Sequence, residues 1–326
     1  MKEIIIVGAD ISKATIDLYI KPFENSLCIE NNPKGLKQWL KEFKGSTRAE
    51  VLVVMEHTGR YSRKFECFLA DQSIGYCKVP ALQIKRSMGM QRGKNDKVDA
   101  KRIAEYGWLR RDILTADVPC QNDIIKLKDL WSLRAKLVRD RTGFINRLKE
   151  MKSTEIKIDK YLEQMHQKYI ARFTQDIEQI AEKIKQIIAA NKDLEKTYAL
   201  ICSIKGVGLI VATYMITSTN NFKKFAKARK FNCYAGLAPF KYESGSSIRG
   251  RSRVSHLANK DAKALLNLAA SSAIRCNGEL KKYYQKRVAE GKRKMSCLNI
   301  IRSKIVARMF AVVKRQTPYV ELYSVA

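Results

Sequence analysis

The chain has 326 residues and a formal net charge of +31, with 63 Lys and Arg against 32 Asp and Glu. Hydrophobic residues make up 45% of it, which excludes a disordered chain and indicates a folded protein of about two domains. Residues 201–326 contain 25 Lys and Arg but only 5 Asp and Glu, so the excess charge is concentrated there and indicates a polyanionic partner.

Cysteine spacing and hydropathy exclude further classes of protein. The eight cysteines, at positions 28, 67, 77, 120, 202, 233, 276 and 297, form no Cys-x-x-Cys pair, which argues against a zinc site and favours reduced thiols in a cytosol. No apolar run approaches the roughly 18 residues of a membrane span, and the start lacks a signal-peptide cleavage site. A basic membrane-surface protein would share the charge, but no segment has the pattern of a lipid-facing helix. We therefore expect a cytoplasmic protein.

The first 118 residues predict an α/β domain. Alternating and β-branched patterns predict strands over 3–10, 15–20, 26–30, 51–56 and 74–79. Helices are predicted from Pro33, with Asn32 as its cap, over 63–70 and from Asp96, and a basic loop over 85–94 precedes the last one. Three antiparallel strands followed by helix, strand, helix, strand and helix are the order of a ribonuclease-H-like domain.

Four acids of this domain are predicted to meet. Asp10 and Glu56 end two apolar runs, and the ends of neighbouring parallel strands gather at one edge of a sheet. Asp96 and Asp99 are three residues apart on a predicted helix and share a face. Crowded carboxylates repel one another unless a cation holds them, and a ligand set made only of oxygen suits Mg²⁺ or Mn²⁺. The pattern predicts a metal-dependent phosphoryl-transfer site, although a single acid after a strand is more often a turn residue or a helix cap.

Residues 119–198 predict long helices. An apolar stripe runs from Leu127 to Met151, and a second, from Leu162 to Ile187, steps by three and four residues, which is a heptad pattern. A break over 153–159 would let the two helices fold back on each other or pair with another copy of the chain. We expect a structural spacer and assembly arm without chemistry of its own.

Residues 199–326 predict a mainly helical, basic domain. Gly206 and Gly208 lie between two apolar helices, where they form either a helix-hairpin-helix that holds a backbone phosphate or a tight turn. A loop over 240–247 contains Ser244-Gly245-Ser246-Ser247, and Ser and Gly clusters of this kind are usually turns. Arg249, Arg251 and Arg253 follow the loop, and a long apolar helix begins near Ala262.

Three motifs resemble those of the RuvC-like Asp-Glu-Asp-Asp transposases of insertion sequences, the bridge-RNA-guided recombinases. They are Gly8-Ala9-Asp10-Ile11-Ser12-Lys13, Met55-Glu56-His57-Thr58-Gly59-Arg60-Tyr61 and Asn95-Asp96-Lys97-Val98-Asp99-Ala100. The resemblance extends over nearly the whole chain. It implies a RuvC-like domain over 1–118 in which Asp10, Glu56, Asp96 and Asp99 hold Mg²⁺ or Mn²⁺. It also implies a coiled coil used in assembly over 119–198 and a transposase domain over 199–326.

The stretch from Gly236-Leu237-Ala238-Pro239 to Arg253 resembles the C-terminal domain of the same recombinases. There the serine before glycine is the nucleophile, which maps to Ser244, while Ser246 and Ser247 leave the register open. Many relatives have Ser-Lys-x-Gly-Asn where this chain has Ser255-His256-Leu257-Ala258-Asn259, so the assisting basic residue is also open.

The resemblance implies an enzyme that cuts and rejoins DNA. Ser244 would attack the DNA phosphate, with metal on the four acids stabilising the transition state. The predicted nucleic-acid contacts are Lys85, Arg86, Arg92, Lys94, Gly206, Gly208, Arg249, Arg251 and Arg253. The implied partners are target and donor DNA, a noncoding guide RNA and further copies of the chain in a dimer or tetramer, in the cytoplasm of a bacterium or archaeon and associated with its nucleoid.

Two other functions are compatible with the residues alone. A junction resolvase or another structure-specific nuclease would use the acids without the serine. A nonenzymatic nucleic-acid-binding protein would explain the charge but not the acid cluster.

Overall fold

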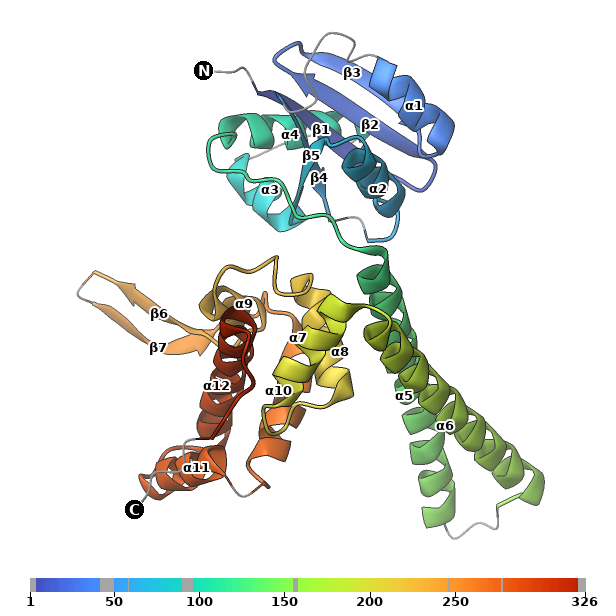
Figure 1. Cartoon of the computed structure of the whole chain (residues 1–326), viewed down its shortest axis with the longest axis vertical. Coiled ribbons are helices and arrows are strands. Elements are labelled where there is room, and N and C mark those ends of the chain that lie inside the picture. The colour runs from blue at the N-terminus through green and yellow to red at the C-terminus, as the bar shows by residue number, and fades with distance from the viewer. Residues whose placement is uncertain are drawn as a thin grey trace. The chain divides into compact units, whose positions relative to one another are not determined.

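The structure is a computed structural model that describes residues 4–41, 50–57, 59–89, 96–154, 158–245, 247–276 and 278–321. The chain forms two compact units, Met1–Pro119 and Cys120–Ala326 (Figure 1). The first unit contains β1 (Ile5–Ile11), β2 (Thr15–Lys21), β3 (Asn25–Glu30), α1 (Pro33–Lys41), β4 (Val51–Glu56), α2 (Arg63–Asp71), β5 (Gly75–Val79), α3 (Ala81–Ser87) and α4 (Asp96–Leu109).

The first unit is built on a five-stranded mixed sheet in the order β3-β2-β1-β4-β5. β1 pairs antiparallel with β2 and β2 with β3, whereas β4 is parallel to both β1 and β5. The predicted strands are confirmed, and so is the Asn32 cap, whose Oδ1 accepts a hydrogen bond from the Gly35 backbone N–H at 2.9 Å. The prediction of a loop over all of 85–94 was wrong at its start, because Lys85 and Arg86 belong to α3. That helix forms because its buried residue, Ile84, packs on the sheet.

Alternation along the strands gives the sheet two different faces. One face carries the odd-numbered residues of β1 and β4, such as Val7 and Val53, and packs against Trp39 of α1 and Phe65 of α2. The other carries Ile6 and Val54 and packs against α3 and α4. Figure 1 shows the two pairs of helices on the two sides of the sheet.

The second unit is mainly helical. It contains α5 (Asn122–Ser153), α6 (Lys160–Ala189), α7 (Lys192–Cys202), α8 (Leu209–Thr219), α9 (Ala228–Tyr234), β6 (Pro239–Ser244), β7 (Ile248–Val254), α10 (Lys260–Ala273), α11 (Glu279–Ala289) and α12 (Lys294–Arg315). Of the two arrangements predicted for the long helices, α5 and α6 adopt the one that folds back within the chain. Asp159 starts α6 by accepting hydrogen bonds from the backbone N–H groups of Tyr161 and Leu162. In the described part of the chain, no helix is both long and apolar enough to cross a membrane.

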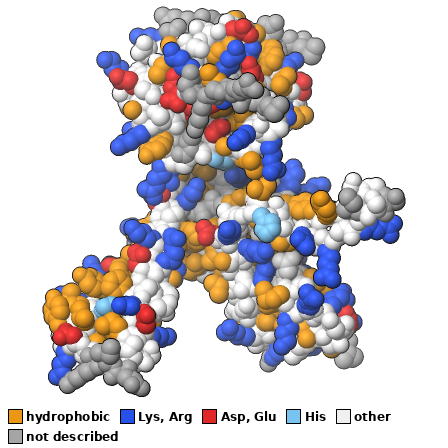
Figure 2. All heavy atoms as spheres, turned by 180° about the vertical axis from the view of Figure 1, so that it is seen from behind, with side chains coloured by type: hydrophobic (Ala, Val, Ile, Leu, Met, Phe, Trp, Pro, Cys, Tyr) orange, Lys and Arg blue, Asp and Glu red, His pale blue; other side chains and the backbone are white. Residues whose placement is uncertain are grey.

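The core of the second unit joins the base of the α5–α6 pair to the C-terminal helices. Leu127 of α5 and Ile184 of α6 are buried in one cluster with Phe231 and Ile305. Farther along the pair, the ring of Phe144 contacts those of Tyr169 and Phe173, with centroids 5.2 and 5.6 Å apart. Figure 2 shows hydrophobic side chains gathered at the far end of this arm.

A two-stranded antiparallel hairpin, β6–β7, stands where a loop was predicted. Every residue of β6 is exposed, so the segment lacks the buried alternation that identifies most strands. Its turn contains Gly245 at a φ of +54°, a left-handed backbone that glycine adopts without strain. Figure 1 shows the hairpin extending from the helices of its own unit beside α9 and α12.

Candidate active site and nucleic-acid interface

Asp10 and Glu56 lie at the ends of neighbouring parallel strands. Ala9 of β1 is aligned with Met55 of β4, so the two acids are the next residues at the same edge of the sheet. Ala9 and Met55 are both buried against α1 and α2. Because side chains alternate along a strand, Asp10 and Glu56 belong to the opposite face, which α4 covers.

Close packing brings the first turn of α4 to the same place. A Cβ on Gly8 would lie 2.3 Å from both the carbonyl oxygen of Ala100 and the backbone nitrogen of Ala104, so only glycine lets the helix approach this strand. Asp96 and Asp99 form the first turn of this helix, immediately before the contact. The structure therefore brings all four predicted acids to the α4 side of one sheet edge.

The electrostatics of Asp10 reflect this crowding. Asp10 is half-buried, and burial raises the pKa of its carboxyl above the ordinary value. The negative charges of Asp96, Asp99 and Asp17 raise that pKa further, in that order. Asp99 is held by an ion pair, since Arg102 Nη1 lies 2.9 Å from Asp99 Oδ1.

Asp17 is an acid that the sequence analysis missed. It lies opposite Asp10 in the antiparallel pair of β1 and β2, and its residue is 8% exposed. Its other cross-strand neighbour is Cys28, whose thiol hydrogen-bonds to the Asp17 carboxylate. The alternation of Ile16, Leu18 and Ile20 already placed Asp17 on the face away from the α1–α2 core.

The segments that follow the two strand-end acids are tied together by a buried side chain. Asn31 Nδ2 donates to the carbonyl oxygen of Ser12, after β1, at 2.9 Å. It also donates to that of Tyr61, after β4, at 3.2 Å. The Asn31 residue is 7% exposed, so these bonds are largely shielded from competing water.

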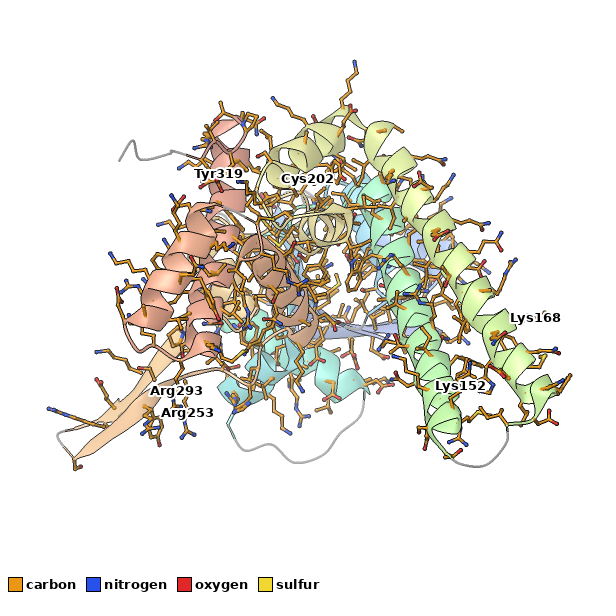
Figure 3. All side chains as sticks on the ribbon, turned by 90° about the horizontal axis from the view of Figure 1, so that it is seen from below. Lys152, Lys168, Cys202, Arg253, Arg293 and Tyr319 are labelled. Atoms are coloured by element: carbon orange, nitrogen blue, oxygen red, sulfur yellow. The ribbon has the colours of Figure 1, made fainter. Side chains whose placement is uncertain are left out.

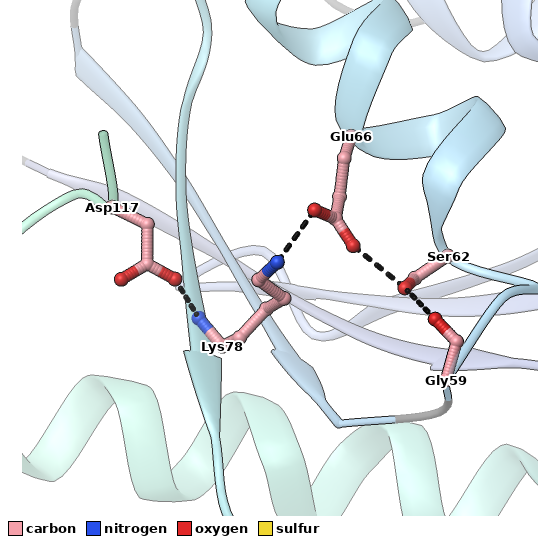
Figure 4. A network of polar contacts seen from close by, with 5 residues as sticks. All are labelled: Gly59, Ser62, Glu66, Lys78 and Asp117. Atoms are coloured by element: carbon pink, nitrogen blue, oxygen red, sulfur yellow. Dashed lines mark hydrogen bonds and ion pairs between the residues drawn. The ribbon is translucent and has the colours of Figure 1, made fainter. Parts of the chain in front are cut away.

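A second network fixes the start of α2, just beyond Glu56 (Figure 4). Ser62 Oγ donates to Glu66 Oε1 at 2.6 Å, and Lys78 Nζ lies 2.5 Å from Glu66 Oε2. The backbone N–H of Lys78 also donates to Asp117 at 2.9 Å. Glu66 and Asp117 are therefore used to hold the fold together.

The donor set of the acidic site fits a hard divalent cation, because carboxylate oxygens are the ligands that Mg²⁺ and Mn²⁺ prefer. The acidic side chains are not yet close enough together to form a metal centre. Within the residues that the structure describes, no three His, Cys, Asp or Glu side chains are grouped to hold one ion. A bound cation would offset the repulsion that raises the pKa of Asp10.

The predicted serine lies in the second unit, on the hairpin. Ser244 is the last residue of β6 and is exposed; it pairs with Ile248 across the turn. Of the two alternatives, Ser247 is exposed in the turn and Ser246 lies outside the described residues. The exposed residues Arg249, Arg251 and Arg253 are all on β7.

Two family models match the chain. One, described as a transposase and named for the DEDD transposases of IS110, matches residues 7–152. The other, described as the transposase IS116/IS110/IS902 family, matches residues 198–285. The chain belongs to the IS116/IS110/IS902 family of transposases. The first match contains the four acids of the sheet edge, and the second contains the hairpin with Ser244.

Individual relatives agree with this assignment. The pilin gene-inverting proteins of Moraxella bovis and Moraxella lacunata are each 25% identical to the transposase over 328 residues, covering 96% of this chain and 97% of the relative. A 43.6 kDa protein of insertion element IS110 from Streptomyces coelicolor is 27% identical over 120 residues, covering 37% of this chain and 29% of that protein.

Both ends of the hairpin in this transposase are anchored by asparagines. After β7, Asn259 Nδ2 donates to the Tyr234 hydroxyl at 2.8 Å, and Asn259 Oδ1 accepts from the Tyr214 hydroxyl at 3.1 Å. Before β6, Asn299 Nδ2 donates to the carbonyl oxygen of Leu237 at 2.8 Å. The hairpin therefore leaves the helical body from a fixed base.

Arg302 supports the second anchor from inside the core. Its residue is 4% exposed, and its guanidinium donates to Asn267 and, at 3.5 Å, to Asn299 Oδ1. Burial lowers the pKa of this guanidinium from its ordinary value. By occupying the Asn299 oxygen, Arg302 leaves the amide nitrogen aimed at Leu237.

The other predicted nucleic-acid contacts differ in their packing and exposure. A Cβ on Gly206, whose φ is +91°, would lie 2.4 Å from the carbonyl oxygen of Ala269, which gives this glycine a packing role. Gly208 precedes α8 and has open space around the Cβ position. Lys85 and Arg86 are exposed on α3, and Arg92 and Lys94 lie outside the described residues. Phosphate binding by these residues stays a prediction.

Proposed function

We propose that this transposase cuts and rejoins DNA through a serine nucleophile, Ser244, assisted by divalent metal on Asp10, Glu56, Asp96 and Asp99. The observation that supports it most is geometric: the pairing of β1 with β4 puts Asp10 and Glu56 at one edge of the sheet, and the close packing of α4 on Gly8 brings Asp96 and Asp99 to the same side. The order and pairing of the five strands also support a ribonuclease-H-like, RuvC-like domain. Asp10, Glu56, Asp96 and Asp99 would hold the cation, Mg²⁺ or Mn²⁺, which when bound would supply charge stabilisation for phosphoryl transfer.

The chemistry of the chain's own residues differs from that of a hydrolytic nuclease. The Ser244 hydroxyl loses its proton and its Oγ forms a bond to the phosphorus, while one bridging P–O bond of the DNA strand breaks. The released strand oxygen takes up a proton. The phosphoserine ester keeps the bond energy, so a hydroxyl of another DNA end can displace the serine and reseal the strand. Ser244 is exposed and able to meet such a phosphate.

The charge of the second unit supports DNA as its substrate. Arg249, Arg251 and Arg253 would neutralise backbone phosphates, and contacts of this kind make binding sensitive to salt. We propose a noncoding guide RNA as a second partner, as the resemblance to the bridge-RNA-guided recombinases implies, and the large positive charge of the chain is compatible with it. Figure 3 shows cationic side chains on both the hairpin and the arm, with Arg253, Lys152 and Lys168 labelled.

Assembly into a dimer or tetramer is part of the same proposal. The end of the α5–α6 arm exposes apolar side chains that a second copy can cover: Tyr161 is 66%, Leu162 46% and Tyr169 44% exposed. A hollow beside them is lined by Met151, Ile158 and Leu162. A serine from one copy and acids from another would then form a composite site.

The decisive experiment incubates the protein with DNA from the ends of its own element, the flanking transcript and Mg²⁺. Reactions are resolved on a denaturing gel. We expect a covalent protein–DNA adduct that disappears with Ser244→Ala and persists with Ser247→Ala. Full strand cleavage by Ser244→Ala would instead establish the structure-specific nuclease, and activity unaffected by both Asp10→Ala and Mg²⁺ removal would establish a nonenzymatic binder.

A further inference from the structure

The β6–β7 hairpin has two faces of different chemistry. β6 alternates regularly, so Phe240, Tyr242 and Ser244 share one face. Cross-strand partners point the same way, which places Arg253, the partner of Phe240, on that face as well. Glu243 and its partner Arg249 lie on the other face.

The aromatic rings on the serine's face are unusually exposed. Phe240 is 51% and Tyr242 71% exposed, although such rings normally contribute to a core. Tyr242 lies across Gly250, where a Cβ would be 2.9 Å from its ring, so the ring has a supported position on the hairpin. Its outward surface is left for a flat, apolar partner.

The charge of the hairpin indicates which class of partner it binds. The hairpin carries Lys241, Arg249, Arg251 and Arg253 against Glu243 alone. A second copy of the hairpin would repel it, whereas a polyanion with flat apolar groups satisfies both the arginines and the rings. Nucleic-acid bases stack on aromatic side chains in this way regardless of their sequence.

The distance between the two aromatic residues distinguishes an unpaired nucleic-acid strand from a duplex as the partner. Residues two apart on a strand are about 6.8 Å apart. Successive nucleotides of a duplex strand rise about 3.4 Å, and their base faces are already covered by neighbouring bases. The two rings therefore match an extended strand whose bases are separated, with Ser244 one further step along the same line.

We propose that Phe240 and Tyr242 form a stacking platform for unpaired nucleotides of the DNA strand that Ser244 attacks, with Arg253 holding its backbone. The inference rests on the proposed function for the identity of the strand, but not for the stacking itself. The platform holds the strand extended beside the serine, so that the attacked phosphate follows two stacked bases.

The test measures equilibrium binding by the full-length protein without divalent metal. The probes are a labelled mixed-sequence single-stranded DNA, its duplex and the RNA of the same sequence. We expect Phe240→Ala and Tyr242→Ala each to weaken single-stranded DNA binding by roughly 5- to 100-fold, and duplex binding by less than about 2-fold. Tyr242→Phe, which keeps the ring, should bind as the unchanged protein does. Phe23→Ala, at a ring 66% exposed in the first unit, is the matched control.

The possible outcomes separate the platform from its alternatives. Equal losses for single strand and duplex, no loss in either alanine variant, or a loss confined to RNA would each overturn the proposal. Losses for both DNA and RNA single strands support it, because stacking does not depend on the sugar. Circular dichroism of each variant confirms folding. If Ser244→Ala still formed the covalent adduct, Ser244 would not be the nucleophile, but the binding results would still support the stacking platform.

Discussion

The acidic face of the first unit and the serine-bearing hairpin of the second place their residues by opposite means. Around Asp10, backbone-to-helix packing at Gly8 leaves no room for even a methyl group. Around Ser244, every residue of β6 is exposed, and hydrogen bonds to the helical body hold the base of the hairpin. Carboxylates that share a cation need positions set by folding, whereas groups that meet a long polyanion need solvent access. The two halves of the proposed chemistry therefore differ in what a mutation can damage.

The largest effect is expected from removing an acid of the fixed face. Asp10→Asn and Glu56→Gln should each lower Mg²⁺-dependent strand cleavage by roughly 10³-fold or more, because ligands that act as a unit fail together. DNA binding without metal should stay within about 2-fold, since neither side chain is cationic. The measurement is single-turnover cleavage alongside filter binding. Cleavage retained by Glu56→Gln would remove Glu56 from the ligand set.

Filling the contact between β1 and α4 should be the next largest change. Gly8→Ala should destabilise the first unit by about 3 kcal/mol, because the atoms that its Cβ meets at 2.3 Å are backbone and cannot rotate away. Gly75→Ala, where the nearest atom lies at 3.4 Å, is the matched control in the same sheet. Urea unfolding of both variants measures the difference. Similar stabilities would show that α4 moves aside without cost.

The raised pKa of Asp10 predicts a smaller, pH-dependent effect. A carboxyl whose folded pKa lies above its ordinary value of 3.8 stabilises the fold below that value and loses this contribution as pH rises through its folded pKa. Asp10→Asn should therefore raise the melting temperature of the metal-free protein at pH 7 by a few degrees and leave it nearly unchanged at pH 3. Mg²⁺ should stabilise the unchanged protein but not the variant. An unchanged melting temperature at both pH values would contradict the burial described for Asp10.

The smallest effect is expected from a single cation of the exposed hairpin. Arg251→Ala should weaken duplex binding modestly and lower the slope of log affinity against log salt concentration by about 0.9, the contribution of one phosphate contact. Lys168→Ala, on the α5–α6 arm, tests whether charge anywhere on this unit has the same effect. Equal slopes for the two variants would assign the salt dependence to the whole unit and not to the hairpin.

Much of the first unit was predictable because the central strands β1 and β4 are buried on both faces. Runs such as Ile4–Ala9 and Val51–Met55 are continuous and apolar, so both the strands and the acids at their ends are visible in the sequence. Asp17 was passed over because it stands inside a strand and not at its end. Its alternation with Ile16 and Leu18 identified the face but not the neighbour, since pairing with Asp10 depends on a register that only the fold sets.

The hairpin was not predictable from the same signals. Every residue of β6 is exposed, and the Ser-Gly-Ser-Ser segment after it has the composition of an irregular loop. The start of α3 was missed for a related reason, because Lys85 and Arg86 hide a helix held by the single buried residue Ile84. Where cross-strand pairing or one core contact decides the structure, composition alone favours a loop.

One irregularity of the hairpin has a wider consequence. Between the pairs Phe240–Arg253 and Tyr242–Gly250, one residue of β6 faces two of β7, which is a β-bulge. In an unbroken ladder Arg249, Arg251 and Arg253 would all point the same way. The additional residue turns Arg253 to the reverse side from Arg249, so each face of the hairpin carries an arginine. If the hairpin binds DNA as proposed, cations on both of its faces would let it lie between two phosphate backbones and act as a wedge that keeps separated strands apart.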